Sequence, residues 1–135
     1  MIELVLVVLI IGILAAVSAP RYFRLVERNR TEEAIQAFRA IKGAQDRYFS
    51  KHGAYLIGPV GGLDIVVPNL QYFNAWPNMT AGTGVPSWRI RATRNRAASI
   101  YGAYVLTFDA RAAGAPSLTC SNAACQNDLL AALIP

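Results

Sequence analysis

Two cysteines near the C-terminus are the most reactive side chains of this sequence. Cys120 and Cys125 enclose four residues, and the chain has no other cysteine and one histidine, His52. A structural zinc site takes four nitrogen or sulfur ligands, so these three residues are too few to form one. We therefore favour a disulfide over a pair of free thiols. A disulfide would indicate an oxidising compartment outside the cytoplasm.

The sequence offers no convincing set of catalytic residues. His52 lies at the end of a predicted helix, where we expect it to contact terminal carbonyl groups rather than to act as a base. There is no GxxxxGK[ST] phosphate loop, and Asp64, Asp109 and Asp128 are far apart in the chain. We expect no enzyme activity, no cofactor and no metal, with calcium bound by carboxylates left open as an alternative.

A basic group lies next to Trp88 and Tyr101 and consists of Arg89, Arg91, Arg94 and Arg96. Arginine interleaved with aromatic residues is typical of surfaces that contact nucleic acid. A solvated edge or an ion-paired face between subunits explains the same residues, and we prefer that interpretation. Nucleic-acid contact is kept as the alternative.

Two tripeptides match the Asn-X-Thr pattern for N-glycosylation, and they begin at Asn29 and Asn78. Asn29 falls within a predicted helix, which is a poor acceptor site. Asn78 falls in a predicted loop and is therefore the candidate for glycosylation.

Length and charge limit the protein to one domain with a modest core. The chain has 135 residues, a formal net charge of +5 and a pI near 9.6. The charge is distributed unevenly: residues 4–20 carry none, whereas residues 21–51 carry eight basic and four acidic residues. The basic residues therefore flank an apolar segment, and a large multidomain enzyme is excluded.

The apolar segment is long enough to cross a membrane. Residues 1–19 form a helix of about 28 Å at about 1.5 Å per residue, close to the roughly 30 Å of a bilayer core. A cleaved signal peptide is the competing interpretation, but no basic residue precedes the segment and its apolar run is too long. The arginines that follow would place the rest of the chain in the cytoplasm by the positive-inside rule, which suggests that N-terminal sequence is missing.

Three residues are unusual for a plain membrane anchor. Glu3 is a carboxylate near the end of the apolar segment, so it needs either an interfacial position or a partner. Gly12 and Pro20 both weaken a helix, and Pro20 cannot donate a hydrogen bond to residue 16. We therefore predict a helix that is kinked or can melt locally.

The helix is predicted to continue beyond the membrane. Apolar residues between Phe23 and Phe49 recur at three- and four-residue steps, which indicates an amphipathic helix with one buried stripe. The opposite face is charged. Its Arg and Glu side chains are either solvated or paired within and between helices. Gly53 is a plausible end, giving a helix of about 50 residues and roughly 75 Å.

The remaining residues predict a small antiparallel sheet. Residues 53–87 are rich in Gly and Pro and form a long loop with one short strand or turn. Residues 88–94 alternate between apolar and polar, residues 101–111 are rich in strand formers, and residues 117–120 add a third strand. A hairpin link falls at residues 95–100, and the apolar residues 128–135 are expected to pack back on the sheet. The expected fold is α+β, with the long N-terminal helix packed on the sheet.

This organisation divides the chain into four parts. They are a transmembrane helix segment at 1–20, an amphipathic helix that continues it at 21–52, a Gly/Pro-rich loop at 53–87, and a sheet with a Cys-bounded C-terminal region at 88–135.

The N-terminal segment resembles a known family. IELVLVVLIIGILAAVSAPRY, residues 2–22, is similar to the mature N-terminus of type IV pilins and of type II secretion pseudopilins. A single Glu is followed after nine residues by Gly, after eight more by Pro, and after two more by Tyr22. YFSKHGAY at residues 48–55 is also similar to the end of this helix in many pilins. The cysteine pair fits the disulfide-bounded region common among them.

The resemblance implies a structural protein rather than an enzyme. A major pilin is held in the bacterial inner membrane and then polymerises into an extracellular filament, with Glu3, Gly12 and Pro20 serving subunit assembly. Its implied partners are other copies, a prepilin peptidase, motor ATPases, a platform protein and a secretin. The implied outputs are adhesion, twitching, secretion or DNA uptake. The alternatives are a pseudopilin and a membrane-anchored DNA-binding or adhesive minor pilin.

The sequence departs from the family pattern at its beginning. Family members carry a short basic leader that ends in Gly, and they usually begin with a methylated Phe two residues before the position of Met1. Neither feature is present. We expect that either the gene model starts late or the subunit matures differently.

Overall fold

The computed structural model describes residues 1–67, 69–74, 78–82, 84, 86–94 and 99–130. One long helix, α1 (Ile2–His52), is followed by a 3₁₀ turn, η1 (Val60–Gly62), and by four strands. The strands are β1 (Thr80–Ala81), β2 (Ser87–Thr93), β3 (Val105–Arg111) and β4 (Ser117–Cys120). A short helix, α2 (Ala123–Cys125), and a π-helical turn, η2 (Gln126–Leu130), end the described part. The predicted α+β fold is confirmed.

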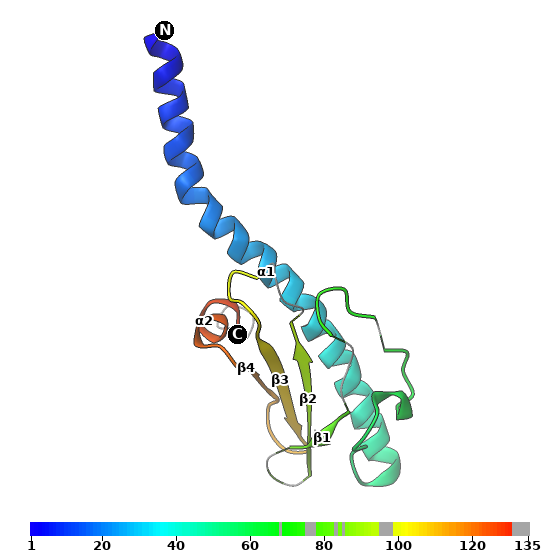
Figure 1. Cartoon of the computed structure of the whole chain (residues 1–135). Helices are drawn as coiled ribbons and strands as arrows, with labels where there is room; N and C mark the ends of the chain where they lie inside the picture. Colours follow the sequence, from blue (N-terminus) through cyan, green and yellow to red (C-terminus); the bar gives the residue numbers. More distant parts are fainter. Residues whose placement is uncertain (68, 75–77, 83, 85, 95–98, 131–135) are drawn as a thin grey trace.

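The four strands form an antiparallel sheet in the order β1-β2-β3-β4. The register of β2 and β3 pairs Trp88 with Ala110 and Ile90 with Phe108. These side chains point toward α1, whose C-terminal half covers that face of the sheet (Figure 1). The N-terminal half of α1 projects away from this head. The molecule is therefore a small two-layer head on a long helical stem.

The core forms where the apolar stripe of α1 meets the inner face of the sheet. Phe38 is fully buried and stacks on Phe108, with ring centroids 5.4 Å apart, and Trp88 lies 5.6 Å from the same ring. Ala34, Ile41 and Ala44 lie on the same stripe and are also fully buried. The small alanines let the sheet approach the helix closely, while the aromatic rings fill the space between the two layers.

α1 ends where the sequence predicts. Gly53 adopts a left-handed conformation with φ of 72°, and its N–H donates to the Phe49 carbonyl at 2.8 Å. A residue with a Cβ would be strained there, which explains why glycine ends the helix. His52 lies beside this end, with Nδ1 3.0 Å from the Tyr48 carbonyl oxygen, in agreement with its expected contact with terminal carbonyls.

Side chains of α1 hold the long loop that follows it. The amide of Gln45, fully buried, donates to the Leu56 carbonyl at 2.8 Å and accepts from the Leu56 N–H at 3.0 Å. The Glu33 carboxylate accepts from the backbone N–H groups of Gln71 and Tyr72 at 2.7 and 3.3 Å. The predicted loop therefore contains η1 and β1 and is fastened to the helix by these hydrogen bonds.

One strand prediction needs adjustment. The strand predicted at residues 101–111 begins at Val105. The Arg94 N–H still donates to the Tyr104 carbonyl at 2.8 Å, whereas the Tyr101 hydroxyl donates to Asp128 in the C-terminal segment at 3.3 Å. The predicted third strand at residues 117–120 is β4. In the C-terminal stretch, Leu129 and Leu130 are buried as expected, while residues 131–135 lie outside the described part, as do residues 95–98 of the expected hairpin link.

Phe38→Ala tests the packing of α1 on the sheet. Truncating a fully buried Phe removes apolar contacts and leaves a cavity, so we expect the free energy of unfolding to fall by about 3–5 kcal/mol. Near-UV circular dichroism of the full-length chain in detergent micelles during chemical denaturation measures this change. Phe23→Ala is the matched control, since Phe23 lies on the same helix and is 53% exposed. Equal losses in the two variants would contradict the assignment of the core.

Candidate assembly surface and its anchor

The first half of α1 is an uncovered apolar surface. All of residues 1–25 are exposed, and the large side chains include Leu4 at 69%, Leu9 at 59% and Ile13 at 60% exposure. An 18-residue window of α1 has a mean hydropathy of 2.8 and no buried residue, so this helix could cross a membrane by its length and composition. A surface of this size is not stable in water and indicates a lipid or protein environment.

The three residues predicted to serve assembly all lie on this exposed half. Glu3 lies in the first turn of α1, and a Cβ placed on Gly12 would have no atom within 4 Å outside the helix itself. Pro20 lies inside α1, which continues unbroken past it and curves along its length (Figure 1). In this structure the segment between Gly12 and Pro20 is helical, and its local melting stays a prediction.

A buried ion pair anchors α1 to the head directly below the exposed half. The guanidinium of Arg94, which follows β2, donates from Nε to Glu27 Oε1 at 2.6 Å and from Nη2 to Oε2 at 3.3 Å. The two side chains are only 3% and 2% exposed. Arg94 also donates to the Tyr72 carbonyl at 2.9 Å and packs over the rings of Tyr72 and Phe73. One pair therefore joins the helix, the long loop and the end of β2.

Further hydrogen bonds complete the surroundings of the Glu27 carboxylate. The buried Tyr104 hydroxyl donates to Oε1 at 2.9 Å, and Arg30 donates to Oε2 at 3.3 Å. Thr31 Oγ1 lies 3.1 Å from the Tyr104 hydroxyl and donates to the Glu27 carbonyl at 3.0 Å. A buried charge with this many donors is stabilised in its ionised form.

The pKa values of the network follow from its geometry. Burial by itself raises the pKa of Glu27, but the hydrogen bonds from Arg94, Tyr104 and Arg30 and the charge of Arg94 outweigh it, so this pKa lies below its usual value. Burial likewise opposes the charge of Arg94, but Glu27 raises its pKa above the usual value. Burial raises the pKa of Tyr104, which keeps its hydroxyl protonated as a donor.

This pair is absent from the predictions made from the sequence, although the pattern of the sequence indicates that each of the two residues is buried. Glu27 precedes the buried Thr31, Ala34 and Phe38 at steps of four, three and four residues, so it belongs to the buried stripe rather than the charged face. Arg94 continues the alternation of Trp88, Ile90 and Ala92 and therefore points inward. Arg94 was predicted to belong to an exposed basic group. That prediction is wrong, because Arg94 is only 4% exposed.

Two other arginines of the basic group lie on the outer face of the sheet. Arg89 and Arg91 line a shallow hollow together with Asn78 and Thr80, so the structure brings the glycosylation candidate next to them. Arg89 donates to Asp109 Oδ2 from Nε at 3.0 Å and from Nη2 at 2.6 Å, which offsets part of the positive charge. Arg96 lies outside the described residues. Contact of this face with nucleic acid or with another subunit, and glycosylation of Asn78, stay predictions.

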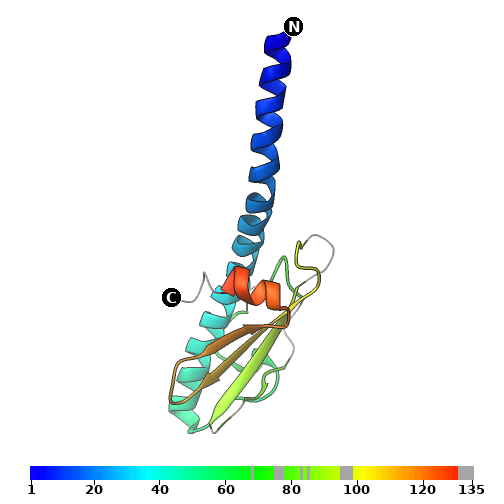
Figure 2. The same cartoon turned by 90° about the vertical axis from the view of Figure 1, so that its left-hand side faces the viewer.

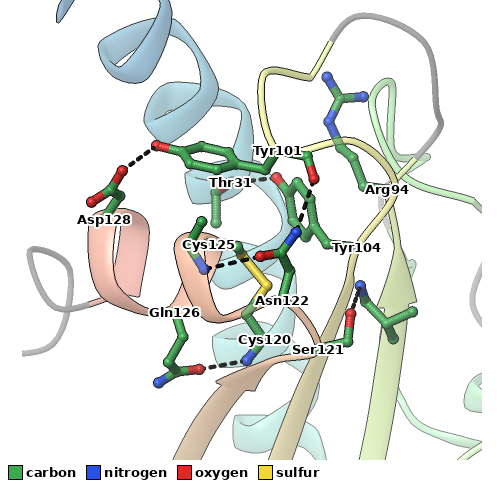
Figure 3. The surroundings of a disulfide bond; sticks show 12 residues. Thr31, Arg94, Tyr101, Tyr104, Cys120, Ser121, Asn122, Cys125, Gln126 and Asp128 are labelled. Atoms are coloured by element: carbon green, nitrogen blue, oxygen red, sulfur yellow. Dashed lines mark hydrogen bonds between the residues drawn. A yellow bond between two sulfur atoms is a disulfide. The ribbon is translucent and has the colours of Figure 1, made fainter.

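The cysteines form the predicted disulfide, which joins the end of β4 to α2 (Figure 3). The backbone N–H of Cys120 donates to Gln126 Oε1 at 2.6 Å, and Cys125 is fully buried. The Asn122 side chain caps α2 by accepting from the Ala124 N–H at 2.9 Å, and it donates to the Tyr101 carbonyl at 3.0 Å. The short segment that follows is therefore firmly placed.

This C-terminal segment contacts α1 beside the exposed half. The Asp128 carbonyl accepts from Arg28 Nη2 at 3.2 Å, and its carboxylate accepts from the Tyr101 hydroxyl at 3.3 Å and lies 3.7 Å from Arg24 Nε. Figure 2 shows α2 and η2 lying beside α1 where the helix enters the head. α1 is thus held here from a second direction.

The three aspartates that were considered as calcium ligands lie apart in the structure, and each lies near a different arginine. Asp64 accepts from Arg47 at 2.8 Å and Asp109 from Arg89, while Asp128 lies near Arg24. Among the described residues, no three His, Cys, Asp or Glu side chains lie close enough together to hold a metal ion. The folded chain therefore does not bring these aspartates into one calcium site.

Glu27→Gln tests the anchor. The amide keeps the shape of the side chain but leaves Arg94 buried without a counter-charge, so we expect the free energy of unfolding to fall by about 3–5 kcal/mol. Chemical denaturation of the full-length chain in micelles, followed by near-UV circular dichroism, measures it. Glu32→Gln is the control, because Glu32 pairs with Arg39 at the surface and is expected to contribute less than about 1 kcal/mol. A loss no larger than that of the control would count against the anchor.

The lowered pKa of Glu27 also predicts sensitivity to acid. A carboxyl group with a lowered folded-state pKa contributes stability above its unfolded value, about 4.3, and loses it as the pH falls through the folded value. We expect the difference in unfolding free energy between the wild type and Glu27→Gln to be constant from about pH 5 to 7 and to shrink below about pH 4. Repeating the denaturation series across this range measures it, and a difference that grows in acid would refute the assignment.

Two curated proteins are similar to this chain in sequence. The fimbrial protein EcpC of Eikenella corrodens is 34% identical over 94 residues, which cover 69% of this chain and 61% of EcpC. The type IV major pilin protein PilA of Myxococcus xanthus is 40% identical over 55 residues, which cover 41% of this chain and 25% of PilA. The chain thus spans less than two thirds of either relative. No protein-family model and no solved structure matches it.

The relatives agree with the architecture. Both carry pilin or fimbrial names, and this chain has a long helix with an exposed apolar half, an antiparallel sheet packed on the other half, and a C-terminal disulfide. In sequence and in architecture the chain is therefore similar to type IV pilins.

Proposed function

We propose that this protein is the major structural subunit of a type IV pilus filament. The observation that carries the proposal is the division of α1 into an exposed apolar half and a half buried on the head. An apolar helix of this kind can leave a lipid bilayer for a bundle of identical helices without exposing its surface to water. Repeated head-to-tail contacts that do not close generate an open helical filament.

Glu3 has a specific role in this proposal. A carboxylate is unfavourable inside an apolar bundle unless a positive group compensates it. In the filament Glu3 would neutralise the N-terminal amine of a neighbouring subunit. Because the interaction is strong only at short range in a medium of low dielectric constant, it would also set the axial register between subunits.

Gly12 and Pro20 have a second role in the same proposal. Pro20 has no N–H, so the carbonyl of residue 16 lacks its normal helical donor, and Gly12 lowers helix propensity further. The segment between them would lose helicity and stretch when subunits pack. The exposure of this whole segment supports the proposal, because no contact with the described head opposes such a change.

The proposal implies a route and a set of partners. The subunit would be held in the bacterial inner membrane, processed by a prepilin peptidase, and polymerised by motor ATPases on a platform protein through a secretin to the cell surface. The filament would support adhesion, twitching motility or DNA uptake. The name of the Myxococcus xanthus relative, a type IV major pilin, supports the major-subunit assignment.

The direct experiment is electron microscopy of fibres sheared from cells, with mass spectrometry of their main subunit. Finding this chain as the main component supports the proposal. Its absence from fibres that are present, with the protein confined to the membrane fraction, would favour a type II secretion pseudopilin or an anchored minor pilin that binds DNA or surfaces.

Glu3→Ala tests the assembly mechanism. Membrane insertion should be normal, because the change makes the helix more apolar. Filament yield should fall by roughly tenfold or more, which corresponds to about 1.4 kcal/mol lost at each contact. Alkaline carbonate extraction measures insertion, and quantification of sheared fibres measures assembly. Glu32→Ala removes a carboxylate from the head-packed half of the same helix and should assemble normally. Abundant, wild-type-like filaments from Glu3→Ala would exclude the pairing.

A further inference from the structure

A compact group of exposed side chains marks the boundary between the apolar half of α1 and the head. Arg21, Tyr22, Phe23 and Arg24 follow the uncharged residues 4–20 directly, and all four are exposed. Tyr22 is 63% and Phe23 53% exposed, and their rings pack edge to face with centroids 5.9 Å apart. We call these four residues the interfacial collar.

The collar lies at a distance that matches a bilayer. Glu3 and Arg21 are separated by 18 residues, which is about 27 Å along a helix at about 1.5 Å per residue and close to the roughly 30 Å of a hydrocarbon core. When Glu3 lies at one interface, the collar lies at the other. Tyr and Arg are residues that favour this position, since an amphipathic ring and a long cationic stem each reach both phases.

The charges around the collar leave Arg21 and Arg24 available to an anion. In the described part of the chain, no carboxylate lies within 4 Å of Arg21, and the nearest carboxylate of Arg24 is Asp128 at 3.7 Å. The Asp128 carboxylate also accepts from the Tyr101 hydroxyl at 3.3 Å, so Arg24 shares this acidic group with Tyr101. The side chain of Arg24 is 60% exposed. The collar is therefore net positive and faces outward.

We infer that the interfacial collar binds the phosphate groups of phospholipids on the head side of the bilayer. The inference rests on the membrane-held subunit of the proposed function. A guanidinium matches a phosphate with two parallel hydrogen bonds, and two guanidinium groups one helical turn apart match neighbouring headgroups. These contacts set the depth of α1 in the membrane. A subunit that leaves for a filament must exchange them for contacts with another copy.

The test is solid-state NMR of the full-length chain in phospholipid vesicles. Dipolar dephasing of arginine ¹³Cζ by lipid ³¹P reports guanidinium groups in contact with phosphate. The arginine ¹³Cζ signal of the wild type should be dephased by lipid ³¹P. The double variant Arg21→Gln, Arg24→Gln should lose more than half of that dephasing. Arg39→Gln, Arg47→Gln is the matched control, since it removes the same charge from exposed positions on the same helix, at least 15 residues, or about 22 Å, beyond the collar. The control should dephase like the wild type.

Each result has a distinct meaning. Unchanged dephasing in the collar variant, or an equal loss in the control, overturns the inference. A wild type that resists carbonate extraction but shows no dephasing also overturns it, leaves the proposed function standing, and assigns the collar to contacts between copies. If alkaline carbonate releases the wild-type protein from the vesicles, the protein is not held in the membrane, and the proposed function itself is refuted. Near-UV circular dichroism confirms that the variants keep a native head.

Discussion

The buried pair of Glu27 and Arg94 determines how the two halves of this molecule relate to each other. Glu27 is the first buried residue of α1, so the pair lies where the helix passes from full exposure to burial. Arg94 ends the inward-facing alternation of β2 and also holds the Tyr72 carbonyl of the long loop. Removing two charges from water is unfavourable, and only the additional donors, Tyr104 and Arg30, make this arrangement stable. The direction in which the stem leaves the head depends on that geometry.

A second attachment acts from the opposite end of the chain. The disulfide and the Asn122 cap place η2 so that Asp128 meets Arg24 and Arg28, while Leu129 and Leu130 enter the core. A disulfide that spans five positions restricts little beyond its own loop, so its effect is local and works through the residues it positions. α1 is therefore held by the end of β2 and by the C-terminal segment, and residues 1–23 extend beyond both attachments.

The division of α1 explains how one chain can suit two environments. The head is an ordinary aqueous domain with an apolar core and a polar outer sheet face carrying Arg89 and Arg91. The stem has the opposite character, since its side chains are apolar and uncovered. Such a stem is compatible with lipid and with a bundle of its own copies, because in both cases its apolar surface is excluded from water. The boundary between these regions is a band of charge from Arg21 to Arg30.

Sequence by itself determined the features that depend on local order along the chain. Hydropathy and three- and four-residue periodicity predicted a helix of the correct length, Gly53 predicted its end, and the spacing of Glu3, Gly12, Pro20 and Tyr22 indicated the family. Only the tertiary structure decided which buried charges pair with each other. Glu27 and Arg94 are 67 positions apart, and a charge is stable in the interior only when its partner is brought to within hydrogen-bonding distance. Both residues had the correct periodicity, but the pairing depends on which elements pack together, and no local pattern contains that information.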